Sequence, residues 1–208
     1  MNRDLVAPLC GVAFVVLVLI TFFLTGQGQD PAKKTAQEVV SHYTDKDTQE
    51  AISLGLISIA GIFLLFFAGW IRQLFRAAEG ESGMLSGVAF GALVVIAGGL
   101  GVGATIHLAL IDAADNIDPV AVAAINQIDY DFFIPFAVGM ATFLLAAAIV
   151  VFRTGALPRW LGWVAIVGFV VSFAGPAGFF GFVIGMIWIL IVGILGATRG
   201  EGPATAAP

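Results

Sequence analysis

Charged side chains are scarce in this sequence. They make up 11% of its 208 residues, whereas 60% are hydrophobic and the mean hydropathy is +1.03. A typical soluble domain carries about 25% charged residues, so the composition excludes a soluble globular enzyme, a disordered chain and a collagen-like fibre. A single cysteine, Cys10, excludes an intrachain disulfide. The class that remains is an all-α, polytopic membrane protein.

Sequence signatures of catalysis and ion transport are also lacking. The chain has no HExxH, GxSxG, GxxxxGK or CxxC motif. No Asp, Glu, Lys, Arg or His falls in the middle of an expected span, where pumps, ion-coupled transporters and voltage sensors keep ionisable groups. We therefore expect no catalytic residue, no cofactor and no nucleic-acid partner.

Uncharged stretches define the expected spans. Segments 5–29, 51–71, 82–111, 132–152 and 160–198 are each long enough to cross a hydrocarbon core, which needs roughly 20 residues. As one helix the last would run roughly 58 Å, and Gly175-Pro176-Ala177-Gly178 divides it. The first is too long for a signal-peptide core and is expected to stay uncleaved. The sequence predicts one transmembrane domain, 1–198, and a flexible tail, 199–208, with spans at about 5–25, 51–75, 84–111, 132–152, 160–174 and 178–197.

The basic residues predict the orientation. Six spans place both termini on one side of the membrane, and that side receives all six arginines, whereas the three lysines fall on the other. The positive-inside rule then puts both termini in the cytoplasm of a cell whose plasma or inner membrane holds the protein. The outer side carries ten acidic residues. These either keep the outer surface hydrated or attract cations or a basic protein partner.

Short helices are expected in both long outer loops, 26–50 and 112–131. Asp30-Pro31 and Asp118-Pro119 each combine an N-cap residue with a proline suited to the first helical position. The segment from Asp47 to Glu50 resembles a capping box that would start the second span.

Two groups of side chains are the candidates for a binding site. His42 and His107, with Asp112 and Asp115, are weak candidates for a divalent metal site, although the simplest interpretation of His107 is a bond to a carbonyl or water. An apolar pocket between helices is the second candidate, and core packing or lipid contact is its alternative. Its expected lining is aromatic: Trp188, Phe143, Phe179 and Phe180.

Three GxxxG pairs predict close contacts between helices. They serve either packing within the chain or a homo-oligomer, and their members are Gly87 and Gly91, Gly99 and Gly103, and Gly181 and Gly185.

The segment RTGALPRWLGW, Arg153 to Trp163, resembles the cytoplasmic turn of a family of small bacterial multi-span membrane proteins. The similarity extends to Tyr43 before the second span, to the Trp70–Arg76 helix end and to the Asn-x-x-Asp segment from Asn126 to Asp129. The resemblance implies the same multi-span fold, and it implies no activity.

Three functions fit these observations. The first is a non-catalytic accessory or scaffold subunit that works by association. The second is a protein that binds or transports an apolar small molecule or lipid through a pocket between helices. The third is a sensor of metal or pH at the outer face, built on the two histidines and the aspartates.

Overall fold

The structure, a computed structural model, describes residues 3–25, 30–174 and 178–199. The described chain is helical and contains no strand, as expected. The helices are α1 (Arg3–Thr25), α2 (Ala36–Asp45), α3 (Asp47–Glu79), α4 (Met84–Asn116), α5 (Pro119–Asp131), α6 (Ile134–Thr154), α7 (Arg159–Val171) and α8 (Gly178–Arg199). Most of the expected break at 175–178, and the tail beyond 199, lie outside the described residues.

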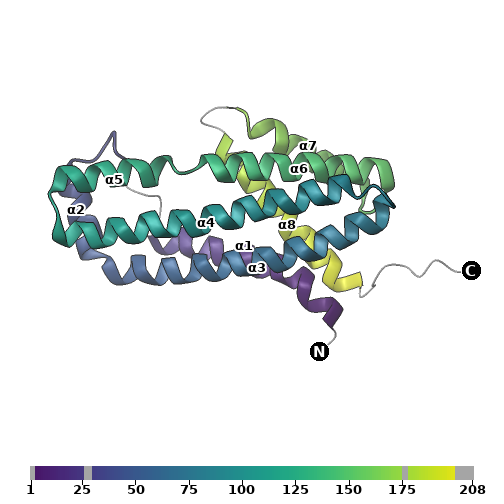
Figure 1. Cartoon of the computed structure of the whole chain (residues 1–208), viewed down its shortest axis with the longest axis horizontal. Coiled ribbons are helices and arrows are strands. Elements are labelled where there is room, and N and C mark those ends of the chain that lie inside the picture. The colour runs from purple at the N-terminus through teal and green to yellow at the C-terminus, as the bar shows by residue number, and fades with distance from the viewer. Residues whose placement is uncertain (1–2, 26–29, 175–177, 200–208) are drawn as a thin grey trace, which may run out of the picture.

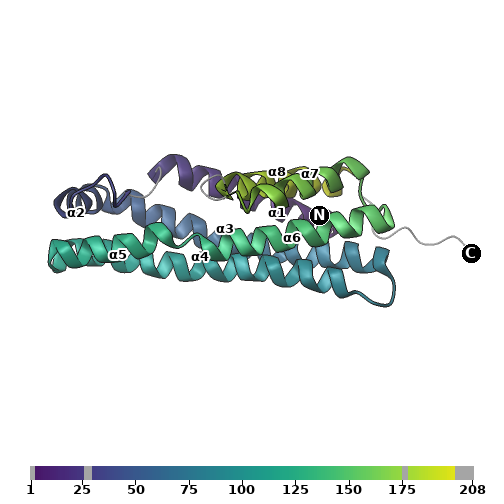
Figure 2. The ribbon, with the colours of Figure 1, turned by 90° about the horizontal axis from the view of Figure 1, so that it is seen from above.

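The apolar helices form a closed ring. Going around it, α1 packs on α3, α3 on α4, α4 on α6, α6 on α7, α7 on α8, and α8 returns to α1. Figures 1 and 2 show α3, α4 and α6 as one layer of long helices, with α1, α7 and α8 against it. The buried interior contains both small and large apolar side chains and includes Phe67, Ala147 and Trp188.

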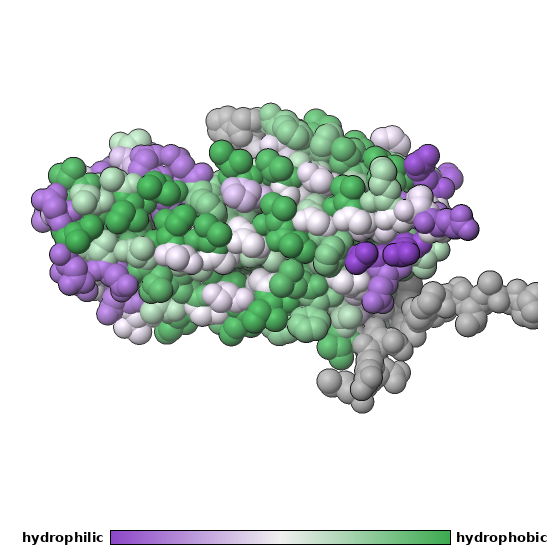
Figure 3. Space-filling model, in the orientation of Figure 1, coloured by the Kyte–Doolittle hydropathy of each residue, from purple (hydrophilic) through white to green (hydrophobic). Residues whose placement is uncertain are grey.

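Five stretches of helix are long and apolar enough to cross a membrane, which supports a multi-pass membrane protein. The fifth expected span, 160–174, corresponds to the shorter helix α7, whose 13 residues extend about 20 Å. The ends of α3, α4 and α6 meet charged or polar connections, and a broad apolar belt separates two hydrophilic ends of the molecule (Figure 3). That distribution is typical of a protein surrounded by lipid.

A small second core lies at one end of the bundle. Helices α3 and α4 each have 33 residues, about 50 Å, and extend well beyond a hydrocarbon core of about 30 Å. Their far ends meet α2 and α5, and Val39, Tyr43, Leu110 and Val122 are buried among these helices. We call α2, α5 and the adjoining ends of α3 and α4 the cap (Figure 1).

The two expected helices of the outer loops are present, but one begins elsewhere. Asp118 caps α5 through a bond from the Val120 amide, as Asp-Pro predicts. Asp30-Pro31 instead forms a turn, and α2 begins only at Ala36 because Thr35 and Glu38 make a reciprocal capping box.

The predicted capping box at the start of α3 is wrong. The N-cap of α3 is Lys46, which makes no side-chain cap bond, and the Glu50 side chain points to two histidines instead. A carboxylate in the first helical turn remains favourable toward the helix dipole. Glu50 therefore stabilises the helix start electrostatically while its oxygens contact His42 and His107.

The RTGALPR segment forms a tight connection between α6 and α7. Gly155 ends α6 with a φ of +69°, a left-handed conformation that side chains with a Cβ rarely adopt. Pro158 then precedes the first residue of α7. This connection, the α3–α4 connection, the start of α1 and the end of α8 all lie at the end of the bundle opposite the cap (Figure 1).

Candidate functional site

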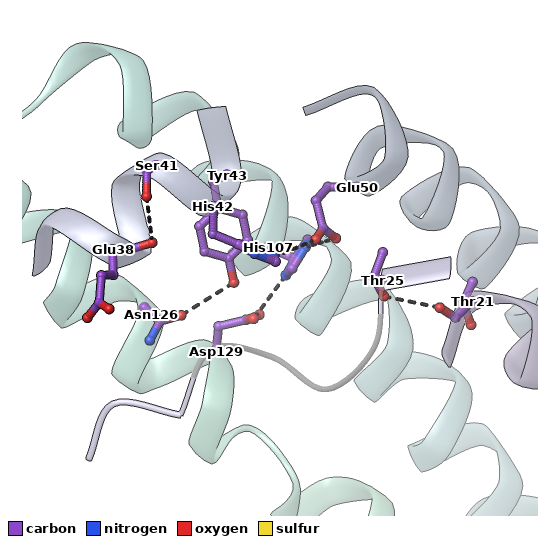
Figure 4. Close-up of polar contacts among 10 residues, drawn as sticks. All are labelled: Thr21, Thr25, Glu38, Ser41, His42, Tyr43, Glu50, His107, Asn126 and Asp129. Atoms are coloured by element: carbon purple, nitrogen blue, oxygen red, sulfur yellow. Dashed lines mark hydrogen bonds and ion pairs between the residues drawn. The ribbon is translucent and has the colours of Figure 1, made fainter. Parts of the chain in front are cut away.

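A buried carboxylate lies where the cap meets the bundle. Glu50, in the first turn of α3, is only 2% exposed. Its Oε1 lies 3.2 Å from Nε2 of His42 on α2, and its Oε2 lies 3.1 Å from Nε2 of His107 on α4. Figure 4 shows both rings turned toward this carboxylate. Burying an unpaired carboxylate costs free energy, and the contacts with the two histidines offset that cost for Glu50.

His107 connects Glu50 to a second carboxylate. Its Nδ1 lies 2.9 Å from Oδ2 of Asp129 on α5, so both ring nitrogens face acidic oxygens. A neutral imidazole donates from one nitrogen only, whereas an imidazolium donates from both. The arrangement therefore needs a proton beyond that of a neutral ring, held by His107 or by one of the carboxyl groups.

Tyr43 fixes the two histidines from the side. Its ring meets the rings of His42 and His107 edge to face, with centroids 5.1 Å and 5.6 Å apart. Its hydroxyl donates to Oδ1 of Asn126 at 3.3 Å. Asn126 and Asp129 are three residues apart on α5, which puts both side chains on the same helix face. Burial and the nearby carboxylates raise the pKa of the Tyr43 phenol, which keeps it neutral.

His42 is held in its neutral form. Burial is the main cause that lowers its pKa, and the charges of Lys46 and, to a smaller extent, Lys34 act in the same direction. The hydrogen bond and charge of Glu50 oppose these effects without overcoming them. A neutral His42 can still donate one N–H to Glu50.

A cavity of about 360 Å³ opens next to these side chains and is lined by α1, α3, α4, α5 and α6. One part of its wall is polar and includes Thr21, Thr25, Glu50, Ser53, His107 and Asp129. The rest is apolar, with Leu54, Ile57, Leu100 and Phe136. Its volume falls within the range typical of small-molecule sites, about 300–1,000 Å³.

Ser53 is the unusual member of this wall. It is 7% exposed, and its hydroxyl oxygen is buried with no hydrogen-bond partner among the described residues. Serines in helices commonly donate to the carbonyl four residues earlier, as Ser58 does to Leu54 at 2.7 Å. Native proteins rarely leave a buried polar atom unsatisfied. The oxygen is closed to water in this structure, so it bonds a molecule in the cavity only when the Ser53 side chain turns toward it.

The structure brings together only two of the four residues proposed for a metal site. His42 and His107 converge on Glu50, whereas Asp112 and Asp115 lie outside this group, and Asp115 accepts a bond from Thr44 at 3.3 Å. His107 contacts two carboxylates rather than the expected carbonyl or water. In the described part of the chain no group of three or more His, Cys, Asp or Glu side chains has an arrangement that could hold a metal ion.

The aromatic residues proposed for a pocket lie apart from this cavity. Trp188 is fully buried, donates from Nε1 to the Leu161 carbonyl at 3.0 Å and packs edge to face on Phe143. Phe179 and Phe180 are exposed at the start of α8.

The three glycine pairs differ in their surroundings. Gly181 and Gly185 lie against Ser172 and Met140 so closely that a Cβ would clash. Gly99 and Gly103 face Phe136 and Phe132 in tight contact. A Cβ at Gly87 or Gly91 would meet no described atom within 4 Å, so this pair faces open space.

Comparisons of the chain with models of protein families, with curated proteins and with solved structures found no match. The resemblance to multi-span bacterial proteins therefore stays a prediction. Three of the residues that carry it, Tyr43, Asn126 and Asp129, lie together in the cap.

Proposed function

We propose that this chain is a non-catalytic, multi-pass membrane protein that binds a small amphiphilic molecule in the cavity beneath its cap. The observation that carries the proposal is the cavity itself, which has a charged, hydrogen-bonding end and an apolar body. Small-molecule sites combine these two kinds of wall, because apolar contact supplies affinity and a few polar groups fix orientation.

The proposal includes an orientation. The end of the bundle that bears the arginines Arg72, Arg76, Arg153 and Arg159 faces the cytoplasm, and the cap faces outward. In that orientation the cavity lies at the level of the outer membrane surface, where an amphiphile from the lipid or from the medium reaches it. A plasma or bacterial inner membrane is the location that this arrangement supports best.

A cavity-filling variant tests this function. Ala104 on α4 lines the cavity, whereas Ala109 on the same helix is exposed outside its wall. Ala104→Phe fills the cavity, and Ala109→Phe adds the same bulk elsewhere. Native mass spectrometry of the full chain, released gently from its own membrane, should show a small molecule retained by the wild type and by Ala109→Phe. Ala104→Phe should lose it.

Two results would contradict the binding function. One is a wild-type protein that carries no small molecule or lipid, and the other is retention of the same molecule by Ala104→Phe. A protein that co-purifies at fixed stoichiometry would instead favour the accessory or scaffold subunit, a hypothesis that rests on the elaborated outer loops. The acidic outer surface would then be the first interface to alter.

A second candidate function is a response to pH at the outer face. Its basis is the continuous path from His42 through Glu50 and His107 to Asp129, which joins α2, α3, α4 and α5. A change of protonation anywhere along this path alters contacts between the cap and the bundle.

A further inference from the structure

Most of the polar side chains that line the cavity are acceptors whose own protons are already used. Thr21 uses its hydroxyl proton on the carbonyls of Leu17 and Val18, at 3.2 Å and 2.8 Å, and Thr25 donates to the Thr21 carbonyl at 3.1 Å. A hydroxyl has a single proton, so each threonine oxygen has only lone pairs left for a ligand. Ser53 adds a hydroxyl that has no partner among the described residues and can either accept or donate.

The same end carries a negative charge that its own residues do not balance. Glu50 and Asp129 each contact His107, and one imidazolium balances only one of the two carboxylates. His42 is kept neutral, and none of the described residues lining the cavity is Lys or Arg. If the ring is neutral, one carboxyl group must hold the shared proton, and the net charge of the group is again −1.

We propose that the ligand of this cavity is a protonated amine with an apolar tail. This inference rests on the proposed binding function and specifies the chemical class of its ligand. An ammonium group brings one positive charge and N–H donors, which match the unbalanced carboxylate and the acceptor oxygens of Ser53, Thr21 and Thr25. A carboxylate or phosphate head would meet like charge and lone pairs, whereas an alcohol would leave the charge unbalanced.

The remainder of the cavity sets the size of the tail. Leu54, Ile57, Leu100 and Phe136 give it an apolar wall, and the Phe136 ring adds a face that attracts cations. A volume of about 360 Å³ lies near the lower end of the range for small-molecule sites, which favours a short tail. Linear n-octylamine is short and is protonated at pH 7.

The test compares three probes that share one tail. The full chain is placed in nanodiscs of phosphatidylcholine, which carries no net charge, and is titrated with n-octylamine, n-octanol and octanoate. Isothermal titration calorimetry measures each affinity, and only the binding that Ala104→Phe removes is assigned to the cavity. We expect n-octylamine to bind at least about tenfold more tightly than either other probe, as a hydrogen bond to a charged group implies.

Two variants examine the contacts. Ser53→Ala should weaken the binding of n-octylamine about three- to tenfold. The matched control is Ser58→Ala, which removes a hydroxyl that is bonded to its own helix and should leave the affinity unchanged. Glu50→Gln should remove the preference for n-octylamine over n-octanol. If Glu50→Gln disturbs the cap, the two serine variants still test the proposal, because neither serine hydroxyl makes a hydrogen bond between described helices.

The outcomes distinguish the amine ligand from the more general binding function of the cavity. The proposed amine ligand would be wrong if n-octanol bound as tightly as n-octylamine, or octanoate more tightly, at a site blocked by Ala104→Phe. The binding function itself would still be supported by that result. The amine ligand would also be wrong if none of the three probes bound at the site that Ala104→Phe blocks. The binding function would then also fall if the wild type released from its own membrane carried no molecule.

Discussion

Nε2 of His107 lies 3.1 Å from the Glu50 carboxylate, although 57 residues separate the two along the chain. The contact joins the cap ends of α3 and α4, the two longest of the described helices. The other oxygen of Glu50 contacts His42 on α2, and the other nitrogen of His107 contacts Asp129 on α5. One carboxylate and one imidazole thus link the cap to the bundle.

Replacing Glu50 by glutamine should loosen the cap. Glu50→Gln keeps the side-chain volume but removes the charge that both histidines face, and one buried charged contact is worth about 2 kcal/mol. The opening free energy of the α2 backbone amides, measured by hydrogen exchange of the protein in nanodiscs, should fall by about that amount. Glu81→Gln removes an exposed carboxylate from the opposite end and should leave α2 unchanged. Equal protection of α2 in Glu50→Gln and wild type would contradict the role given to this contact.

Acidification should destabilise the cap through His42. Its pKa in the folded protein lies below the ordinary value of 6.5, mainly because of burial. The unfolded chain therefore binds more protons, and the contribution of His42 to stability declines as the pH falls below about 6.5. Lys46 and Lys34 oppose its protonation, and Glu50 favours it.

The pH prediction is tested as a difference between two proteins. Hydrogen exchange of α2 is compared in wild type and His42→Gln at pH 7.5 and pH 5, because the difference between the two proteins isolates the His42 imidazole and the contacts that it makes. The stability advantage of wild type over His42→Gln should shrink at the lower pH. An advantage that stays constant or grows on acidification would show that His42 is not held neutral.

The fold was largely predictable, because long uncharged stretches of sequence determine where the apolar helices form. Uncharged stretches predicted six spans. Five of them match long apolar stretches of helix, the remaining one, 160–174, matches the shorter helix α7, and Asp118-Pro119 predicted the start of α5. The start of α2 was missed because Asp30-Pro31 and Thr35–Glu38 are both good helix starts, and only the reciprocal bonds of the second decide between them. The sequence alone does not rank such neighbouring signals.

The candidate site was only half predictable. His42 and His107 were singled out because they are the only histidines of the chain. Glu50 was assigned to a local role at a helix start, and Asp129 was one of many outer aspartates. Their convergence depends on how α2 and α5 fold back over α3 and α4, which is a long-range property. The Asn126–Asp129 spacing, which places both residues on one helix face, was the available signal for α5.

Glycine substitutions should separate internal packing from an open face. A Cβ at Gly181 would lie 2.6 Å from the backbone nitrogen of Ser172, which cannot move aside cheaply. Gly181→Ala should therefore destabilise the α7–α8 contact by about 1–3 kcal/mol. Gly91→Ala, in open space on α4, should be neutral or slightly stabilising because alanine favours helix. Thermal unfolding of both variants in nanodiscs measures the difference, and an equal loss for both would mean that another chain covers Gly91.

The number of membrane crossings is the last property that the structure makes testable. Helix α7 extends only about 20 Å, yet it begins at the end of the bundle where α8 finishes (Figure 1). We therefore expect α7 and α8 to cross as a pair, giving six spans and both termini inside. In a Cys10→Ala background, a membrane-impermeant maleimide should label Asp115→Cys in intact cells, but Thr154→Cys and Thr205→Cys only after permeabilisation. Labelling of Thr205→Cys from outside, with Thr154→Cys protected, would mean that α7 does not cross and that five spans are correct.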